Sequence, residues 1–381
     1  MSYRNTVMSV NDEYSKLVSL GDYIELCDER NSHGKYTLDD IRGISTEKKF
    51  IATKANLDGV SLSAYKVVQK GEFAYVSDTS RRGDKIALGL NTSNNPVLIS
   101  SIYTTFRTID TKKLLPVYLY LFFTREEFDR YSRFNSWGSA RETFDWSEFC
   151  RIQIPLPDIE TQQELVDTYN GLKALAEQNE ALIKPLTEAC QAYIVDCKKK
   201  YPEVELGGYI EPCDERNKDL SVKLSQGISN TKEFQSPKQV AANSNNDKIV
   251  RKGQFAYNRA TTRNGEKISI AYRVGDDCTV SSAYQIFKVT DKEILNPYFL
   301  WLYFKRPEFD RYARYVSKGS AHEFFEFDEM CRVCIPLPPS EIQQAIVNLY
   351  DCAEEAKRIA TEAREKMKML CPALVQRAIN S

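Results

Sequence analysis

The chain has 381 residues, which is enough for two domains of ordinary size that each bury a core. Charged residues make up 28% of the sequence and the mean hydropathy is −0.47, which favours a soluble protein. No apolar run approaches the roughly 18 to 20 residues of a membrane span, and the N-terminus lacks the apolar segment of a signal peptide. The net charge of −1 argues against wholesale coating of nucleic acid, so any nucleic-acid surface must be local. Ten cysteines without framework spacing favour reduced thiols and a cytoplasmic location.

An internal duplication dominates the sequence. Residues 20–31 return as residues 206–217, both with the pattern Leu-Gly-x-Tyr-Ile-Glu-x-Cys-Asp-Glu-Arg-Asn. Further matches follow in the same order, and they are Lys70-Gly71 with Lys252-Gly253, Ser100-Ser101 with Ser281-Ser282, and Glu127–Tyr131 with Glu308–Tyr312. One unit of about 180 residues has therefore been duplicated, which differs from an array of short repeats.

Within each copy, strands come first and helices follow. In chain order, the patterns predict strands over residues 73–76, 86–90 and 97–106, and a helix over residues 116–133 with proline in its first turn. The second copy has a counterpart strand over residues 279–289 and a helix over residues 297–315. The aromatic side chains of these helices are interpreted as core, not as stacking platforms, and they are Tyr118, Tyr120, Phe122, Phe123, Tyr298, Phe299, Trp301, Tyr303 and Phe304.

Each copy ends in a long amphipathic helix of roughly 40 residues, about 60 Å at 1.5 Å per residue. The prolines of Ile154-Pro155-Leu156-Pro157 and Ile335-Pro336-Leu337-Pro338 prevent an earlier start, and Thr161 and Ser340 are the predicted caps. Behind them, apolar or small residues recur at spacings of three and four, as in a coiled-coil seam that includes Tyr193. The residues singled out for the spacer and for partner docking are Leu172, Asn179, Ile183, Leu186, Leu349, Ala356, Ala363 and Leu370.

These features together resemble the specificity subunit of type I restriction-modification systems. The resemblance is carried by the two Lys-Gly-(Glu/Gln)-Phe segments, the two Ile-Pro-Leu-Pro segments, Gln162-Gln163, Gln343-Gln344 and the seams behind them. It covers nearly the whole chain and implies an α/β (α+β) fold with two tandem target recognition domains, each followed by a long helix. The two helices are expected to pair as an antiparallel coiled coil. The implied boundaries are 1–157 and 201–338 for the recognition domains, and 158–200 and 339–381 for the helices.

The resemblance also implies partners. Each recognition domain is expected to read half of a split target on double-stranded DNA. The helix pair is expected to separate the two domains and to dock two methyltransferase subunits, and restriction and translocase subunits join the complex for cleavage. The sequences of the two units resemble each other unusually well. Either the two units read similar DNA half-sites, or they share only one subtype of the fold.

The loop between the first two strands of each copy is the foremost candidate for DNA contact. In the second copy, residues 251–273 carry six positive residues against one negative residue, with Asn and Thr interleaved. Arg and Lys suit phosphates and guanine edges, and Asn suits adenine. The alternative is a solvated basic hairpin. The candidates are Arg81, Arg82 and Lys85 in the first copy, and Asn258, Arg259, Thr262, Arg263, Asn264 and Lys267 in the second.

A second candidate lies between the aromatic helix and the last strand of each copy. It reads Trp137-Gly138-Ser139-Ala140-Arg141 in the first copy and Lys318-Gly319-Ser320-Ala321-His322 in the second. Backbone N–H groups of Gly and Ser can hold a phosphate, and Arg141, Lys318 and His322 are within reach of DNA in such a turn. A purely structural turn is the alternative.

Metal sites and catalysis are not predicted. Neighbouring carboxylates of the Cys-Asp-Glu-Arg-Asn repeat point to opposite faces of a strand, so Arg30 and Arg216 are interpreted as structural or phosphate-contacting instead. Cys331 and Cys334 lack a second pair for zinc. No motif for S-adenosylmethionine or for a nucleotide phosphate is present, which predicts a non-catalytic reader without a cofactor. The alternatives are a self-contained methyltransferase or nuclease with degenerate motifs, and a coiled-coil scaffold without a nucleic-acid role.

Overall fold

The chain forms two compact units, and each contains one set of strands and parts of both long helices. The computed structural model describes residues 16–53, 55–57, 59–79, 85–138, 142–237, 245–260, 267–318 and 323–380, with side chains as far as Met369. Unit 1 comprises the chain up to Glu177 together with Ala360 and beyond, and unit 2 comprises Gln178–Ile359. Within the described residues, no helix has the length and apolar character that a membrane span requires.

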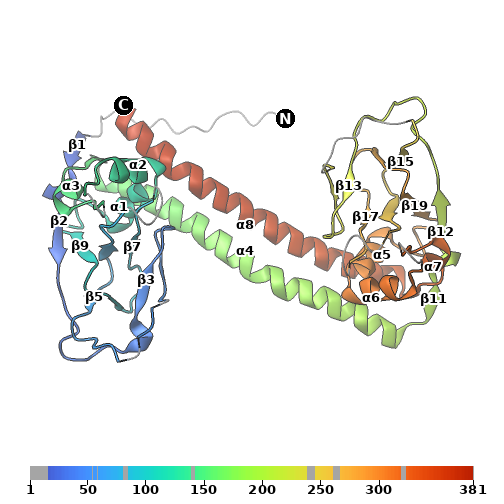
Figure 1. The fold of residues 1–381 in the computed structure, drawn as a ribbon, viewed down its shortest axis with the longest axis horizontal. Coiled ribbons are helices and arrows are strands. Elements are labelled where there is room, and N and C mark those ends of the chain that lie inside the picture. The colour runs from blue at the N-terminus through green and yellow to red at the C-terminus, as the bar shows by residue number, and fades with distance from the viewer. Residues whose placement is uncertain are drawn as a thin grey trace. The chain divides into compact units, whose positions relative to one another are not determined.

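Unit 1 is built on a four-stranded antiparallel sheet in the order β2-β9-β6-β7 (Figure 1). Its strands are β2 (Ile24–Cys27), β9 (Thr104–Thr108), β6 (Phe73–Tyr75) and β7 (Leu88–Leu90). Three further antiparallel pairs are β1 (Lys16–Ser19) with β10 (Gln153–Leu156), β3 (Arg42–Ile44) with β4 (Phe50–Ala52), and β5 (Lys66–Val68) with β8 (Val97–Ile99). The short helices are α1 (Pro116–Phe123), α2 (Glu126–Phe134) and α3 (Trp146–Cys150).

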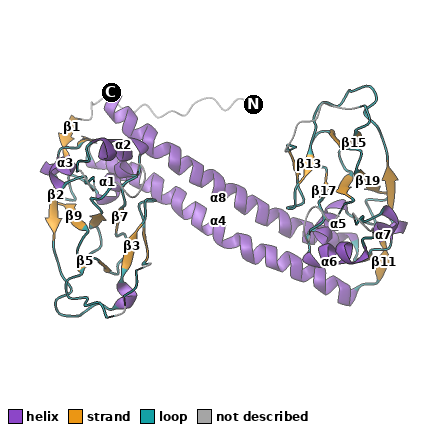
Figure 2. Ribbon diagram, in the orientation of Figure 1, coloured by secondary structure: helices purple, strands orange, loops and turns teal. Residues whose placement is uncertain are grey.

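Unit 2 repeats this topology with the sheet order β12-β19-β16-β17. The sheet strands are β12 (Ile210–Cys213), β19 (Tyr284–Val289), β16 (Phe255–Asn258) and β17 (Ile270–Tyr272). The pairs are β11 (Glu203–Glu205) with β20 (Cys334–Pro336), β13 (Gly227–Ile228) with β14 (Phe234–Gln235), and β15 (Lys248–Val250) with β18 (Cys278–Val280). The short helices are α5 (Pro297–Phe304), α6 (Pro307–Val316) and α7 (Phe327–Cys331). Figure 2 shows strands and short helices gathered within each unit, and the predicted α/β duplication is confirmed.

Several predicted elements are divided in the structure. The strand predicted over residues 97–106 is two strands, β8 and β9, because a turn in which the Tyr103 N–H donates to the Ser100 carbonyl (3.1 Å) separates them. The same turn, from Tyr284 to Ser281 (3.1 Å), divides the counterpart over residues 279–289. Each predicted aromatic helix is also two helices. In unit 2 the break precedes Pro307, which keeps the preceding residue extended.

The core of each unit is aromatic, as predicted. Phe73 stacks on Phe106 with ring centroids 4.7 Å apart, and Phe255 stacks on Phe287 at 4.9 Å. Phe123 and Phe304 approach these pairs edge-on from α1 and α5, and neither is exposed to solvent. Such offset and edge-to-face contacts add to the free energy of burial. The sheet therefore holds the helices through equivalent ring contacts in both units.

The repeated Leu-Gly pair is explained by a close approach of backbone to backbone. Gly21 lies in a short 3-10 turn, and a Cβ atom placed on it would lie 2.8 Å from Cys150 Cβ in α3. A Cβ atom on Gly207 would lie 2.9 Å from Cys331 Cβ in α7. Real Cβ atoms do not approach so closely, so α3 and α7 pack at this distance only against glycine.

Gly21→Ala and Gly207→Ala are expected to destabilise the fold by about 1–3 kcal/mol each, since the added methyl group must displace α3 or α7. The neighbouring Gly208 has no atom within 4 Å of an added Cβ, so Gly208→Ala is the matched control. Urea unfolding of the three variants measures the effect. Equal stability of Gly207→Ala and Gly208→Ala would show that the close approach does not constrain the fold.

The long helices are α4 (Ile159–Lys200) and α8 (Ser340–Asn380), of 42 and 41 residues. They lie side by side and antiparallel (Figure 1). In unit 2, for example, the Cys190 thiol donates to the Ile346 carbonyl (3.7 Å). The cap of α4 is Asp158, not the predicted Thr161, because the Asp158 carboxylate accepts the Thr161 N–H at 2.7 Å. That hydrogen bond holds the pKa of the Asp158 carboxyl below its ordinary value.

The predicted seam is correct in α8 and partly wrong in α4. Ala356 and Ala363 are buried, and small side chains let the partner helix approach closely. Leu172, Asn179, Ile183, Leu186 and Leu349 are half-buried, whereas the side chain of Leu370 lies outside the described residues. Tyr193 is 58% exposed and its neighbour Ile194 is 1% exposed. The seam therefore passes through Ile194, four residues after Cys190, and not through Tyr193.

One buried glutamine joins each long helix to its own unit. Gln162 is fully buried, and its side-chain oxygen accepts the Leu115 N–H at 2.9 Å. Its amide nitrogen donates to the carbonyls of Lys113 and Pro157, both at 2.9 Å. Gln343 makes the same three contacts in unit 2, with Asn296 N–H (2.7 Å) and with the carbonyls of Ile294 and Pro338 (2.8 Å each). A primary amide can satisfy all three groups at once, and no apolar side chain can.

Gln162→Ala is expected to lower the free energy of unfolding by about 2–4 kcal/mol, because it leaves buried backbone groups without hydrogen-bond partners. Gln163 is the matched control, since its side chain is exposed and bonds only to Asp167 on the same helix (2.8 Å). Thermal or urea unfolding of Gln162→Ala and Gln163→Ala checks this. Similar losses in both variants would contradict a special role for the buried amide.

Candidate nucleic-acid interface

Two loops in each unit contain the predicted DNA-contacting residues. We define loop A as residues 76–87 between β6 and β7, and as residues 259–269 between β16 and β17. Loop B comprises residues 135–145 after α2 and residues 317–326 after α6. The central parts of these loops lie outside the described residues, and with them Arg81, Arg82, Arg141, Thr262, Arg263, Asn264 and His322.

In unit 1 the ends of loops A and B are hydrogen-bonded to each other. The Thr79 N–H donates to the Glu142 carbonyl at 3.1 Å, and the Phe144 N–H donates to the Ser77 carbonyl at 2.8 Å. Loop B is itself closed by reciprocal bonds between Trp137 and Thr143 of 3.1 and 3.0 Å. Loops A and B, which the sequence patterns indicated separately, therefore have neighbouring ends on unit 1.

Unit 2 repeats this convergence. The Phe325 N–H donates to the Arg259 carbonyl at 2.9 Å, and Ala260 forms a bridge with Phe324. Lys318 and Phe324 exchange backbone hydrogen bonds of 3.2 and 2.9 Å, which closes loop B. The described ends of loops A and B therefore lie next to each other in both units.

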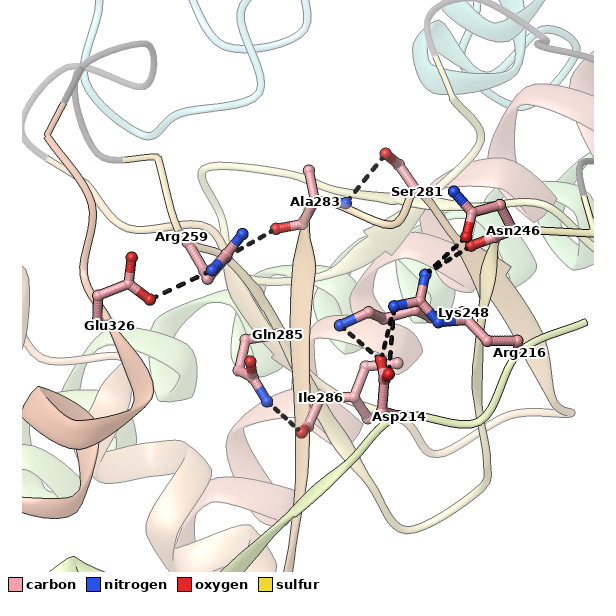
Figure 3. A network of polar contacts seen from close by, with 10 residues as sticks. All are labelled: Asp214, Arg216, Asn246, Lys248, Arg259, Ser281, Ala283, Gln285, Ile286 and Glu326. Carbon is pink, nitrogen blue, oxygen red and sulfur yellow. Dashed lines mark hydrogen bonds and ion pairs between the residues drawn. The ribbon is translucent and has the colours of Figure 1, made fainter. Parts of the chain in front are cut away.

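Arg259 is the best-described basic side chain of the interface (Figure 3). Its guanidinium bonds to the Glu326 carboxylate at 3.2 Å and to the Ala283 carbonyl at 3.4 Å, and it lies over the Phe324 ring. The side chain is 38% exposed and that of Glu326 is 54% exposed. A surface ion pair of this kind contributes little to stability, so the guanidinium can exchange Glu326 for a phosphate at small cost.

The other described candidates differ in exposure and in the hydrogen bonds that their side chains already make. The Asn258 side-chain oxygen accepts the Ala260 N–H at 3.1 Å, so this acceptor already shapes loop A. Lys318 is 82% exposed beside Glu329 (3.4 Å), and Lys267 is exposed. Lys85 bonds to Glu47 at 3.1 Å, and this hydrogen bond raises the pKa of the Lys85 ammonium. Contact of these residues with DNA stays a prediction.

The Cys-Asp-Glu-Arg-Asn repeat has structural contacts in both units. Asp214 pairs with Arg216 (3.0 Å) and with the nearly buried Lys248 (2.9 Å), as Figure 3 shows. The hydrogen bond from Lys248 holds the pKa of the Asp214 carboxyl below its ordinary value. Arg216 also donates to the Asn246 carbonyl at 2.9 Å. The contacts of Asp28 with Arg30 (2.8 Å) and Lys66 (3.2 Å) repeat this in unit 1.

These contacts favour the structural interpretation of Arg30 and Arg216, because each guanidinium also donates to a backbone carbonyl about 30 residues further along the chain, Ala64 (3.1 Å) and Asn246 (2.9 Å). The buried Asn217 closes the following turn by bonding to the Val222 backbone in both directions (2.9 and 3.2 Å). In the part of the chain that the structure describes, no group of three or more His, Cys, Asp or Glu side chains is arranged to hold a metal ion.

Sequence reasoning missed a buried ion pair next to loop A in each unit. Lys48 pairs with Asp129 at 2.5 Å, and Lys232 pairs with Asp310 at 2.7 Å. A signal was present, since both aspartates belong to the repeated Glu-Phe-Asp-Arg-Tyr segments of α2 and α6. Their lysine partners lie in the β3–β4 and β13–β14 turns. These lysines also repeat, in the pattern Gly-Ile-Ser-x-x-Lys-x-Phe at residues 43–50 and 227–234, but the repeat does not indicate which aspartate each lysine contacts.

The structure thus contains a duplicated α/β unit. In each copy two loops converge, and a long helix follows. Residues 215–363 match the family model described as "Type I restriction modification DNA specificity domain". No curated protein matches the sequence. The family resemblance predicted from the sequence is thus confirmed by the match of residues 215–363 to this domain family.

A solved structure of a type I specificity subunit shares the fold of this chain. The S subunit of a type I restriction-modification system from M. genitalium aligns over 96% of this chain and 97% of its own, with 12% identity and a TM-score of 0.58. The HsdS subunit from Thermoanaerobacter tengcongensis aligns over 95% and 96%, with 17% identity and a TM-score of 0.41.

Proposed function

We propose that this chain is the DNA-recognition subunit of a type I restriction-modification complex. Each unit reads one half of a bipartite target on double-stranded DNA, through loops A and B together. The observation that carries the proposal is the convergence of the two loops in both units of a chain whose residues 215–363 match a DNA specificity domain. Arg and Lys side chains on these loops suit phosphate and guanine contacts, and a net charge of −1 keeps such contacts local.

The proposal assigns catalysis to partner subunits. Two methyltransferase subunits dock on the helix pair, and restriction and translocase subunits join them, as the predicted family membership implies. Ala356 and Ala363 are buried between the helices, so they hold the pair together and the outward faces of the helices are left for docking. We also propose that helix length sets the number of base pairs between the half-sites.

Two alternatives make different predictions. A self-contained methyltransferase would bind S-adenosylmethionine stoichiometrically, whereas a recognition subunit without a cofactor site would not. A coiled-coil scaffold without a nucleic-acid role would show no preference for any DNA sequence. Cofactor titration and DNA titration of the purified chain therefore distinguish all three.

Arg259→Ala tests the interface in unit 2. The DNA probe is a duplex with the target defined by mapping methylated sites in a host that carries the complex. If Arg259 contacts a base, the substitution should weaken binding by about 1–3 kcal/mol. If it contacts a phosphate, the slope of log K against log salt concentration should decrease in magnitude by about one. The change should affect only one half-site, because Arg259 belongs to one unit.

The matched control is Arg358→Ala, which removes an exposed arginine that pairs with Glu355 on α8, away from both loops. Its DNA affinity and salt dependence should equal those of the unchanged protein. If Arg259→Ala, with its fold intact, also left both quantities unchanged, the placement of the interface on loop A would be wrong.

A further inference from the structure

In each unit, the second short helix (α2 in unit 1 and α6 in unit 2) holds the end of loop A. In unit 1, Asp129 of α2 is 8% exposed, and its carboxylate accepts the N–H of Ile86 at 3.0 Å. Ile86 is buried and lies at the end of loop A that enters β7. In unit 2, Asp310 of α6 accepts the N–H of Ile268 at 3.1 Å, at the equivalent end of loop A.

A buried lysine fixes this carboxylate in place. Lys48 is 4% exposed, pairs with Asp129, and also donates to the Ile86 carbonyl at 3.1 Å. Both polar backbone groups of Ile86 are thus held by one ion pair. Lys48 has a backbone φ of 59°, and its counterpart Lys232 has a φ of 66°. Lysine rarely adopts this left-handed conformation, so the surrounding contacts must maintain it.

The same helix also holds the end of loop B. Arg133 forms an ion pair with Glu142, which follows the central residues of loop B. Asp129 and Arg133 are four residues apart and therefore lie on one face of α2. The backbone carbonyl of Glu142 accepts the Thr79 N–H at 3.1 Å, which ties this end of loop B to the start of loop A. Asp310, Arg314 and Glu323 repeat the ion pairs of Asp129, Arg133 and Glu142 in unit 2.

We infer that α2 and α6 are positioning helices that fix loops A and B relative to each other, and that base discrimination in each half-site depends on them. The inference rests on the proposed function for its second part, since it takes the loops as the DNA-reading elements. The positioning itself follows from contacts within each unit. Base readout requires donors and acceptors held at defined places, whereas attraction to phosphates does not.

Arg133→Gln is the most informative change, because Arg133 and Glu142 are partly exposed (37% and 36%), so the chain can fold without the pair. Arg130→Gln is the matched control on the same helix, where Arg130 pairs with Glu127 at 3.1 Å and is 65% exposed. Arg314→Gln and Arg311→Gln are the equivalent pair of variants in unit 2, with Arg311 bonded to Glu308 at 3.3 Å.

Amide hydrogen exchange of the full chain tests the positioning without DNA. Arg133→Gln should accelerate exchange severalfold in residues 76–87 and also in residues 137–144, while Arg130→Gln should leave both segments unchanged. Acceleration confined to residues 137–144 would overturn the inference, because loop A would then be held independently of loop B. Equal acceleration by Arg130→Gln would overturn it as well.

Binding to duplexes with single substitutions tests the second part. A specific site commonly discriminates by about tenfold to a hundredfold per substituted base pair. Arg133→Gln should reduce this ratio about tenfold in one half-site only, and Arg314→Gln should do so in the other, with unchanged salt dependence. Unaltered discrimination in both variants would overturn this part. If the unchanged protein showed no sequence preference at all, the proposed function would fail, and the exchange experiment would still decide the positioning.

Discussion

A buried glutamine amide in each unit holds the first turn of a long helix against the backbone of that unit. Gln162 and Gln343 each satisfy a backbone N–H and two carbonyls that no other described side chain is seen to satisfy. These groups belong to the segment before the aromatic helix and to the proline segment before the long helix. The first turn of the long helix is therefore part of the core of its unit. Core packing joins the same parts, since Val166 of α4 is buried with the aromatic helix and the Tyr118 hydroxyl donates to the Pro155 carbonyl at 2.9 Å.

The two copies keep the same residue where a contact depends on the size of a side chain or on its hydrogen-bonding groups. Glycine at 21 and 207 admits a short helix at a distance that a methyl group would prevent. Gly71 and Gly253, at φ values of 85° and 89°, adopt a turn that other residues rarely adopt. The loops that carry the proposed interface differ between the units, whereas the residues that hold their ends are the same types. Such a scaffold can keep its fold while the sequences of its loops change.

The sequence was most informative where structure is local. Proline segments, helical periodicity and repeated motifs predicted the duplication, the two long helices and the aromatic core. Local signals also gave two wrong predictions. The Ser-Ser-x-Tyr turn lies inside an apolar run, so two strands were predicted as one. In α4, Tyr193 was predicted as a seam residue, whereas the buried residue is Ile194. The convergence of loops A and B and the Lys48–Asp129 pair connect residues far apart in the chain. Neither periodicity nor spacing contains that information.

If each unit reads its own half of a bipartite target, replacing one unit by the other changes one half of the methylated site. Ser19 pairs with Gln153, and Glu205 pairs with Cys334 in the same antiparallel register, so residues 19–153 can replace residues 205–334 at matched junctions. The direct measurement is the map of methylated sites in a host that carries this replaced chain with its partner subunits. The account predicts a bipartite site in which the sequence of the first half is read twice. Retention of the original second half, or methylation of an uninterrupted site, would contradict it.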